Sequence, residues 1–224
     1  MTERISPAYR FALGVATPGV RWWGRLEVSG LEELPASGPV LLAGNHDSYW
    51  DPVAIGIAAL PRRQIRALAK SSMWKIRGLD RVLDGMGQIP IDRGAGDVRA
   101  LDRAVEELRG GACIGVFPEG TRSLGRELRA RSGFGRLAAL VPEAEVVCCT
   151  VTGTVDIPRF PSPRPRVRVH FFRPSGGGLQ QGESPMELSE RLMAEIRAAA
   201  PISVAGRRRK AAAREREAAA PVPD

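Results

Sequence analysis

The chain has 224 residues, of which 43% are hydrophobic, and its formal net charge is +8 at pH 7. This length suits one α/β domain with a single core, and no apolar run approaches the roughly eighteen residues that a membrane-spanning helix needs. The N-terminus lacks the pattern of a secretory signal. Three cysteines without a metal-ligand spacing favour a reducing compartment over a disulfide framework or a zinc site.

The positive charge is concentrated at the two ends of the chain. Residues 1–26 hold four arginines against Glu3, and residues 201–224 hold six basic groups against three acidic ones, so each end carries +3. Residues 27–200 are nearly neutral, with 23 basic and 21 acidic groups. Basic ends attract nucleic acid or acidic lipid headgroups, although they also simply keep a protein soluble.

Residues 1–24 combine aromatic and basic side chains. Trp22 and Trp23 stand beside Arg21, and indole rings prefer the headgroup depth of a membrane interface. Packing of both rings on the domain's own core is the alternative, and both interpretations can hold for different faces. Pro18-Gly19 is expected to break any helix here. We expect residues 1–24 to form an amphipathic membrane-docking segment.

Strand-like and helical runs alternate through residues 25–200. Ser184, followed by proline and then Glu187, forms a capping box, and Asp97 is a good N-cap. The alternation predicts a single α/β domain whose mixed, largely parallel sheet is covered by helices. The basic residues 201–224 are expected to be a disordered tail. Strands are expected at residues 40–43, 65–69, 88–91, 112–117, 146–151 and 166–172, and helices at residues 52–60, 98–108, 133–140 and 185–199.

The segment Asn-His-Asp-Ser-Tyr-Trp-Asp at residues 45–51 lies between the first of these strands and the first helix. Imidazole moves protons near neutral pH, and a carboxylate is the usual group that orients it. A step of five residues separates His46 from Asp51 by about 140° on a helix and places them on opposite faces of a strand. They can therefore meet only if the chain turns between them. Asp51 also suits an N-cap before Pro52, and both roles can coexist.

Two further segments end strands with polar residues. In Phe-Pro-Glu-Gly-Thr-Arg-Ser, at residues 117–123, the turn is expected to expose the Glu119 carboxylate and to free the Gly120 amide. Thr121 and Arg122 then offer donors that suit phosphate. Residues 87–93, Gly-Gln-Ile-Pro-Ile-Asp-Arg, end in a second arginine. Each segment alone is compatible with an ordinary polar turn.

Together, in this order and spacing, the three segments closely resemble the blocks of the glycerolipid acyltransferase family, typified by bacterial 1-acyl-sn-glycerol-3-phosphate acyltransferases. Residues 45–51 resemble the NHxSxxD form of its H-x4-D block, and residues 87–93 and 117–123 resemble its second and third blocks. The resemblance extends over about residues 24–154. The fourth block departs from the family, because residues 146–151 lack the usual proline. That departure leaves substrate preference open.

The resemblance implies that His46 is the general base and Asp51 its orienting carboxylate in acyl transfer from a thioester to the free hydroxyl of a lysophospholipid. The expected acceptor is 1-acylglycerol-3-phosphate, giving phosphatidic acid, with another lysophospholipid or a glycolipid as the alternative. The donor is expected to be acyl-CoA or an acyl-carrier-protein thioester, and no metal or bound cofactor is expected. Substrate-binding roles are implied for Lys70, Arg93, Glu119, Gly120, Thr121 and Arg122.

The basic, aromatic N-terminal segment, taken with this activity, predicts a peripheral enzyme on the cytoplasmic face of the cell membrane, with an anionic membrane surface as partner and no nucleic acid. A basic nucleic-acid- or membrane-binding protein without catalysis is the alternative from another class. Its nucleic-acid form is disfavoured because the body is nearly neutral and no aromatic platform stands among basic residues.

Other enzyme classes fit less well. Residues 44–47 match the Gly-Asn-His-Asp box of metallophosphoesterases, but that class needs several histidines and this chain has two. The G-x-S-x-G elbow of serine hydrolases is absent from the sequence. His170, at an alternating strand position, is expected to be structural. Cys148 and Cys149 are expected to be inert core thiols.

Overall fold

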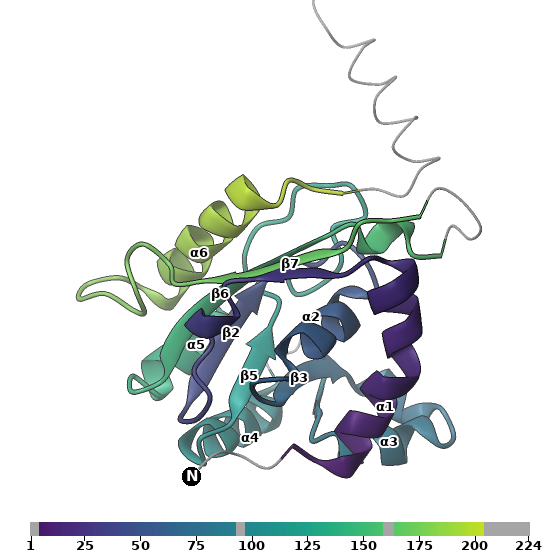
Figure 1. Ribbon diagram of the computed structural model, residues 1–224. Helices are drawn as coiled ribbons and strands as arrows, with labels where there is room; N and C mark the ends of the chain where they lie inside the picture. The colour runs from purple at the N-terminus through teal and green to yellow at the C-terminus, as the bar shows by residue number, and fades with distance from the viewer. Residues whose placement is uncertain (1–4, 93–96, 159–163, 204–224) are drawn as a thin grey trace, which may run out of the picture.

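A seven-stranded sheet in the order β1-β7-β6-β2-β5-β3-β4 is the centre of the computed structural model, which describes residues 5–92, 97–158 and 164–203 (Figure 1). The strand pairs are parallel except β6 with β7, so the expected mixed, largely parallel α/β sheet is confirmed. The strands are β1 (Glu27–Ser29), β2 (Val40–Gly44), β3 (Ile65–Lys70), β4 (Ile89–Ile91), β5 (Cys113–Val116), β6 (Glu145–Thr152) and β7 (Arg168–Phe172).

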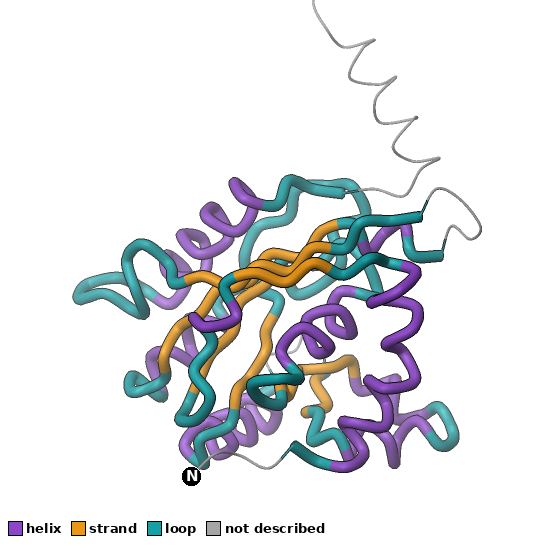
Figure 2. The backbone as a smooth tube through the Cα atoms, viewed as in Figure 1, coloured by secondary structure: helices purple, strands orange, loops and turns teal. Residues whose placement is uncertain are grey.

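Helices cover both faces of this sheet, as the tube view in Figure 2 makes clear. Along β2, Leu41 and Ala43 face α4, α5 and α6, whereas Val40 and Leu42 face α1 and α2. Both faces of the central strand are therefore buried, which explains its continuous apolar sequence. The α-helices are α1 (Pro7–Thr17), α2 (Asp51–Ala59), α3 (Leu79–Gly85), α4 (Val98–Arg109), α5 (Gly133–Leu140) and α6 (Pro185–Ala199).

Two helix starts agree with the local sequence chemistry. The Asp97 side chain accepts a hydrogen bond from the Ala100 amide at the start of α4. At the start of α6, Ser184 and Glu187 form the reciprocal capping box. Such caps satisfy N–H groups that have no partner within the helix, so they fix where each helix begins.

The α-helix ends before Pro18-Gly19 as expected, but the helical path of the chain does not. The α-helical bonding of α1 ends at Thr17, but the chain continues to turn as a π-helix over Pro18–Trp23. The Gly24 amide donates to the Gly19 carbonyl over 3.0 Å. Proline has no N–H and cannot continue the α-helical hydrogen bonds, which explains why α1 ends at Thr17.

The N-terminal segment packs on the domain and also presents an exposed apolar face. Tyr9, Leu13 and Val20 are buried in the core beside α2. The two tryptophans differ: Trp22 is 69% exposed, whereas Trp23 packs on the domain, where its indole donates to the Ile157 carbonyl over 3.0 Å. The exposed large apolar side chains here are Phe11, Val15 and Trp22.

Two short elements have no expected counterpart. Strand β1 is three exposed residues paired in parallel with β7, so it lacks the alternation of buried and exposed positions that predicts a strand. Helix α3 has seven residues and buries Leu83 alone among them. No helix within the described residues combines the length and the apolarity required to cross a bilayer.

Candidate active site

His46 and Asp51 meet across the turn that joins β2 to α2. The Nδ1 atom of His46 lies 3.1 Å from Oδ2 of Asp51. Strand β2 ends at Gly44 and α2 begins at Asp51, so the intervening residues form the turn that the five-residue spacing requires. The His46 side chain is 9% exposed and that of Asp51 is fully buried. The structure thus places a histidine–carboxylate pair just beneath the surface.

The Asp51 carboxylate is held by donors on both of its oxygens. Oδ2 accepts the main-chain N–H groups of Asp47, at 2.6 Å, and Ser48, at 2.7 Å, in addition to its contact with His46. Oδ1 accepts the hydroxyl of Thr154 at 2.5 Å. Trp50, not Asp51, occupies the N-cap position of α2. The alternative role of Asp51 as a helix cap is therefore wrong, because its carboxylate holds the preceding turn instead.

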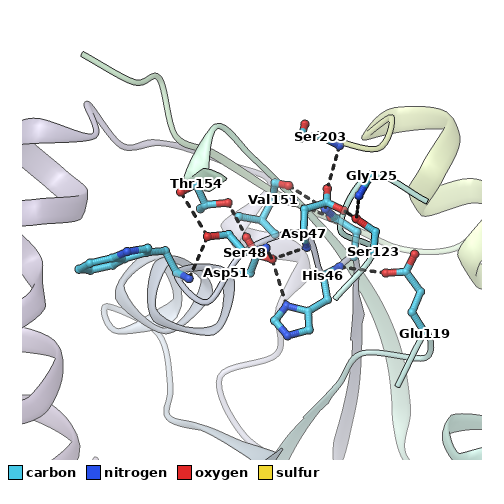
Figure 3. A network of polar contacts seen from close by, with 12 residues as sticks. His46, Asp47, Ser48, Asp51, Glu119, Ser123, Gly125, Val151, Thr154 and Ser203 are labelled. Atoms are coloured by element: carbon cyan, nitrogen blue, oxygen red, sulfur yellow. Dashed lines mark hydrogen bonds and ion pairs between the residues drawn. The ribbon is translucent and has the colours of Figure 1, made fainter. Parts of the chain in front are cut away.

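The His46 ring also packs on an aromatic side chain, and its Nε2 atom is left available. It stacks on Phe117 with ring centroids 4.2 Å apart and planes inclined by 11°. In Figure 3 the imidazole lies below Asp51 and points away from the rest of the polar network. Within the described ranges no hydrogen bond reaches Nε2. A tautomer that donates Nδ1–H to Asp51 presents the Nε2 lone pair as a base.

Parallel strand pairing brings three distant loops to one edge of the sheet. Ala43 of β2 lies beside Val116 of β5 and, on its other side, Cys148 of β6. The loops that follow these strands consequently gather at the carboxyl edge, where ligands bind in such sheets. The Asn45 side chain extends the pairing, since its amide both donates to and accepts from the main chain of Val151 at 2.8 Å.

Glu119 is placed differently from the expectation. The turn buries Glu119, whose side chain is only 1% exposed, and Oε2 accepts the main-chain N–H of His46 at 3.1 Å. Burial raises the pKa of Glu119 above its usual value, although hydrogen bonds and charge from Arg197 act in the opposite direction. The Gly120 amide donates to the Phe117 carbonyl, so it is not free either. Glu119 therefore supports the His46 loop from within.

Arg197, in the last turn of α6, is the cation that partners this buried carboxylate. Its Nη2 atom lies 2.6 Å from Oε1 of Glu119 and 3.0 Å from Oδ1 of Asp47. Sequence reasoning missed this residue, because a lone basic side chain near a helix C-terminus is common on electrostatic grounds. Its partners are 78 and 150 residues away along the chain, so no local pattern indicates them.

The remaining predicted site residues lie near the sheet edge or outside the described residues. The Arg122 guanidinium stacks on the exposed ring of Tyr49, with Cζ 3.4 Å from the ring centroid. Thr121 is exposed. Lys70 is exposed at the carboxyl end of β3, the neighbour of β5. Arg93 falls outside the described residues.

Phe117 also lines a groove of about 530 Å³. Phe117 both stacks on His46 and lines this groove, so the groove adjoins the imidazole through one shared side chain. Its polar lining residues include Asp92, Asp97 and Arg136. Its apolar lining comes from β3, β4, β5, α4 and α5: Leu68, Ile91, Val98, Leu101, Val116, Phe134 and Leu137.

The other candidates from the sequence lie away from this chemistry. Cys148 and Cys149 are buried in β6, as expected for core thiols, and Cys113 is buried in β5. His170 is exposed on β7, where Nδ1 lies 3.0 Å from the Ser29 hydroxyl of β1. That contact links two neighbouring strands.

These features define an α/β protein with a histidine–aspartate pair at the carboxyl edge of its sheet. The sequence profile of the Acyltransferase family matches residues 25–158, and the chain belongs to that family. The resemblance to acyltransferases that the three sequence blocks indicated is thereby confirmed.

Individual relatives agree with this assignment. The chain is 26% identical over 115 residues to a 1-acyl-sn-glycerol-3-phosphate acyltransferase of Bacillus subtilis, covering 51% of this chain and 57% of the relative. It is 35% identical over 108 residues to one of Borreliella burgdorferi, covering 47% and 42%. A lyso-ornithine lipid O-acyltransferase of Pseudomonas aeruginosa is 34% identical over 137 residues, covering 56% and 49%. The chain thus spans about half the length of the curated relatives it matches.

A solved structure supports the fold. The 1-acyl-sn-glycerophosphate acyltransferase PlsC from Thermotoga maritima superposes with a TM-score of 0.64 at 22% identity, covering 85% of this chain and 79% of that one. The fold is therefore similar well beyond the three sequence blocks.

Proposed function

We propose that this protein transfers a fatty acyl group from an acyl thioester to the free hydroxyl of a lysophospholipid. The observation that carries the proposal is the His46–Asp51 pair, at 3.1 Å, with Nε2 of the imidazole left available. A positioned general base contributes about 10²–10⁴-fold to a rate. Membership of the Acyltransferase family and the activities for which the relatives are named support the same reaction.

The reaction follows from the groups present. His46 Nε2 takes the proton of the acceptor hydroxyl as that oxygen attacks the thioester carbonyl carbon. A new C–O bond forms and the C–S bond breaks, and the imidazolium returns the proton to the departing thiolate. Asp51 stabilises the imidazolium and fixes its orientation. The thioester is already activated, so the proposal needs neither a covalent acyl-enzyme nor a metal.

The proposed acceptor is 1-acylglycerol-3-phosphate, whose product is phosphatidic acid. Arg122, Arg93 and Lys70 carry the charge that suits its phosphate, with Thr121 as a further donor. The names of the Bacillus and Borreliella relatives support this choice. The Pseudomonas relative is named for a lyso-ornithine lipid, so an acceptor with another headgroup is the second candidate.

The groove beside Phe117 is the proposed site of the fatty acyl chain of the donor. Its lining is mainly apolar, and Phe117, one of the lining residues, stacks on the imidazole. A long hydrocarbon chain gains about 0.8 kcal/mol for each buried CH₂ group. The thioester carbon of a chain lying in this groove would reach the vicinity of His46.

The exposed face of the N-terminal helices is the proposed membrane contact. Phe11, Val15 and Trp22 lie among the exposed Arg10 and Arg21. Aromatic rings suit the headgroup region, and arginines attract anionic lipids. A peripheral position on the cytoplasmic leaflet would bring the site to both acceptor and product.

The decisive experiment incubates purified protein with acyl-CoA, or with acyl carrier protein charged with a fatty acid, and a panel of lysolipids. Products are identified by mass spectrometry. Phosphatidic acid formed by the wild type and lost in His46→Ala is the expected result. Acylation of another lysolipid, without acylation of 1-acylglycerol-3-phosphate, would assign a different acceptor. The absence of acylated product from every pair would overturn the proposed function.

A further inference from the structure

Arg197 joins the two loops that hold the catalytic histidine. Its guanidinium spans from the Glu119 carboxylate, with contacts of 2.6, 2.8 and 3.0 Å, to the Asp47 carboxylate, with contacts of 3.0 and 3.1 Å. Glu119 belongs to the loop after β5, and Asp47 belongs to the loop after β2. One side chain of α6 therefore connects both loops.

Burial makes this connection important. The side chains of Glu119 and Asp47 are 1% and 3% exposed, and that of Arg197 is 17% exposed. Removing the only cation that contacts both carboxylates, among the described residues, would leave two buried negative charges side by side. Breaking a buried ion pair by removing one partner is strongly unfavourable, so the loops would have to rearrange.

Each of the two loops is joined to the catalytic pair by a main-chain hydrogen bond. Glu119 accepts the main-chain N–H of His46 at 3.1 Å. The main-chain N–H of Asp47 donates to Oδ2 of Asp51 at 2.6 Å, on the same oxygen that contacts the imidazole. A shift of either loop would therefore move the imidazole relative to its orienting carboxylate.

The helix that carries Arg197 is anchored independently of it. Leu188, Leu192 and Ile196 of α6 are fully buried in the core shared with α5 and β2. The helix lies beyond residue 158, where the match to the family ends. Loss of the guanidinium alone should thus disturb the loops without displacing the helix.

We propose that Arg197 is a positioning residue, which locks the loops of Asp47 and Glu119 so that His46 and Asp51 are aligned. This inference rests on the proposed function for its kinetic consequence, but its structural consequence can be measured separately. It assigns part of the catalytic machinery to a helix outside the matched family segment.

The kinetic test compares Arg197→Met and Arg197→Lys with the wild type in the acyl-transfer assay. We expect kcat to fall about 100-fold in Arg197→Met, with KM for the acceptor nearly unchanged, because misplacement by about 1 Å costs this much. Lysine keeps the charge and should recover part of kcat. Arg191→Met is the matched control, since Arg191 lies on the same helix and pairs with Glu183 away from the site.

A second measurement does not depend on catalysis. The chain has two histidines, so ¹⁵N spectra of the imidazoles contain signals from His46 and His170 only. Arg197→Met should shift the His46 signals and leave those of His170 in place, whereas Arg191→Met should move neither set.

The two proposals fail in distinguishable ways. Wild-type protein without acyl transfer but with shifted His46 signals in Arg197→Met would remove the proposed function and retain the positioning role. An active wild type, together with a folded Arg197→Met variant of unchanged kcat and unchanged His46 signals, would overturn the positioning role alone. Glu119→Gln added to Arg197→Met should raise the melting temperature above that of the single variant, and an equal or lower value would also contradict the coupling.

Discussion

Thr154 donates its hydroxyl to Oδ1 of Asp51 over 2.5 Å, although the two residues are 103 positions apart. Thr154 is buried and follows Gly153, which has a φ of +82° that favours glycine. The turn after β6 thus supplies the donor on the oxygen of Asp51 that does not face His46.

Thr154→Val should slow acyl transfer and destabilise the protein. Valine has the shape of threonine but leaves a buried carboxylate oxygen without its donor, which costs about 1–3 kcal/mol. We expect kcat to fall about tenfold, in line with a change of about 1.4 kcal/mol. Thr154→Ser keeps the hydroxyl and should behave much like the wild type. Equal kcat values for valine and wild type would show that this hydrogen bond does not position Asp51.

Asp51→Asn should reduce kcat by about 10²–10⁴-fold, comparable to the loss of a positioned base. The amide presents N–H groups where the carboxylate accepts hydrogen bonds from Asp47, Ser48 and Thr154. Steady-state kinetics and circular dichroism measure activity and fold together. A folded Asp51→Asn variant with wild-type kcat would contradict the role of Asp51.

All three cysteines should resist thiol reagents in the native protein. Burial raises the pKa of Cys148 to about 12 and that of Cys149 well above its ordinary value. A thiol is protonated when the pH is below its pKa, and the thiolate is the reactive form. Cys148 and Cys149 are therefore unreactive at pH 8. We expect negligible alkylation by iodoacetamide at pH 8 in buffer and three modified cysteines in guanidinium chloride. Rapid labelling of Cys148 without denaturant would contradict the buried structure.

Leu101→Trp should change the chain-length preference of the donor. Leu101 lines the groove, and a larger ring there would shorten the space for a hydrocarbon chain. We expect the ratio of kcat/KM for long over short acyl donors to fall about tenfold or more, corresponding to at least two buried CH₂ groups. Leu140→Trp is the control, because Leu140 is exposed on α5 outside the groove lining. An unchanged ratio in Leu101→Trp would place the acyl chain elsewhere.

Replacing Phe11, Val15 and Trp22 together with serine should weaken binding to vesicles that contain anionic lipid. These side chains are already exposed, so the fold should tolerate the change. Sedimentation with vesicles at several salt concentrations measures the effect, because attraction between arginines and lipid is screened by salt. Activity on a short-chain acceptor dispersed as monomers should be retained. Undiminished vesicle binding would assign the membrane contact to another surface.

Most of the fold could be predicted from local patterns. Helices α5 and α6 begin and end where expected, and β2 was recognisable because burial on both faces requires a continuous apolar run. The short β1 and α3 could not be predicted, since three exposed residues and one seven-residue helix have no clear periodicity. The π-helix at Pro18–Trp23 was missed because proline usually ends a helix.

The site could be predicted only in part, for a related reason. His46 and Asp51 are close in sequence, and the turn between them was implied by the strand and helix that flank it. The buried Glu119 carboxylate pairs with Arg197, 78 residues later, and no local sequence pattern indicates that partner. Thr154 and Arg197 reach the site through strand order and helix packing, so only the tertiary structure reveals them.

The place of Arg197 in the chain has a consequence for biosynthesis. All three sequence blocks, and the whole of β2 and β5, leave the ribosome before α6 does. A nascent chain that already contains His46, Asp51 and Glu119 still lacks the guanidinium between the loops. Synthesis must therefore pass the last described helix before the guanidinium of Arg197 can join the loops around His46 and Asp51.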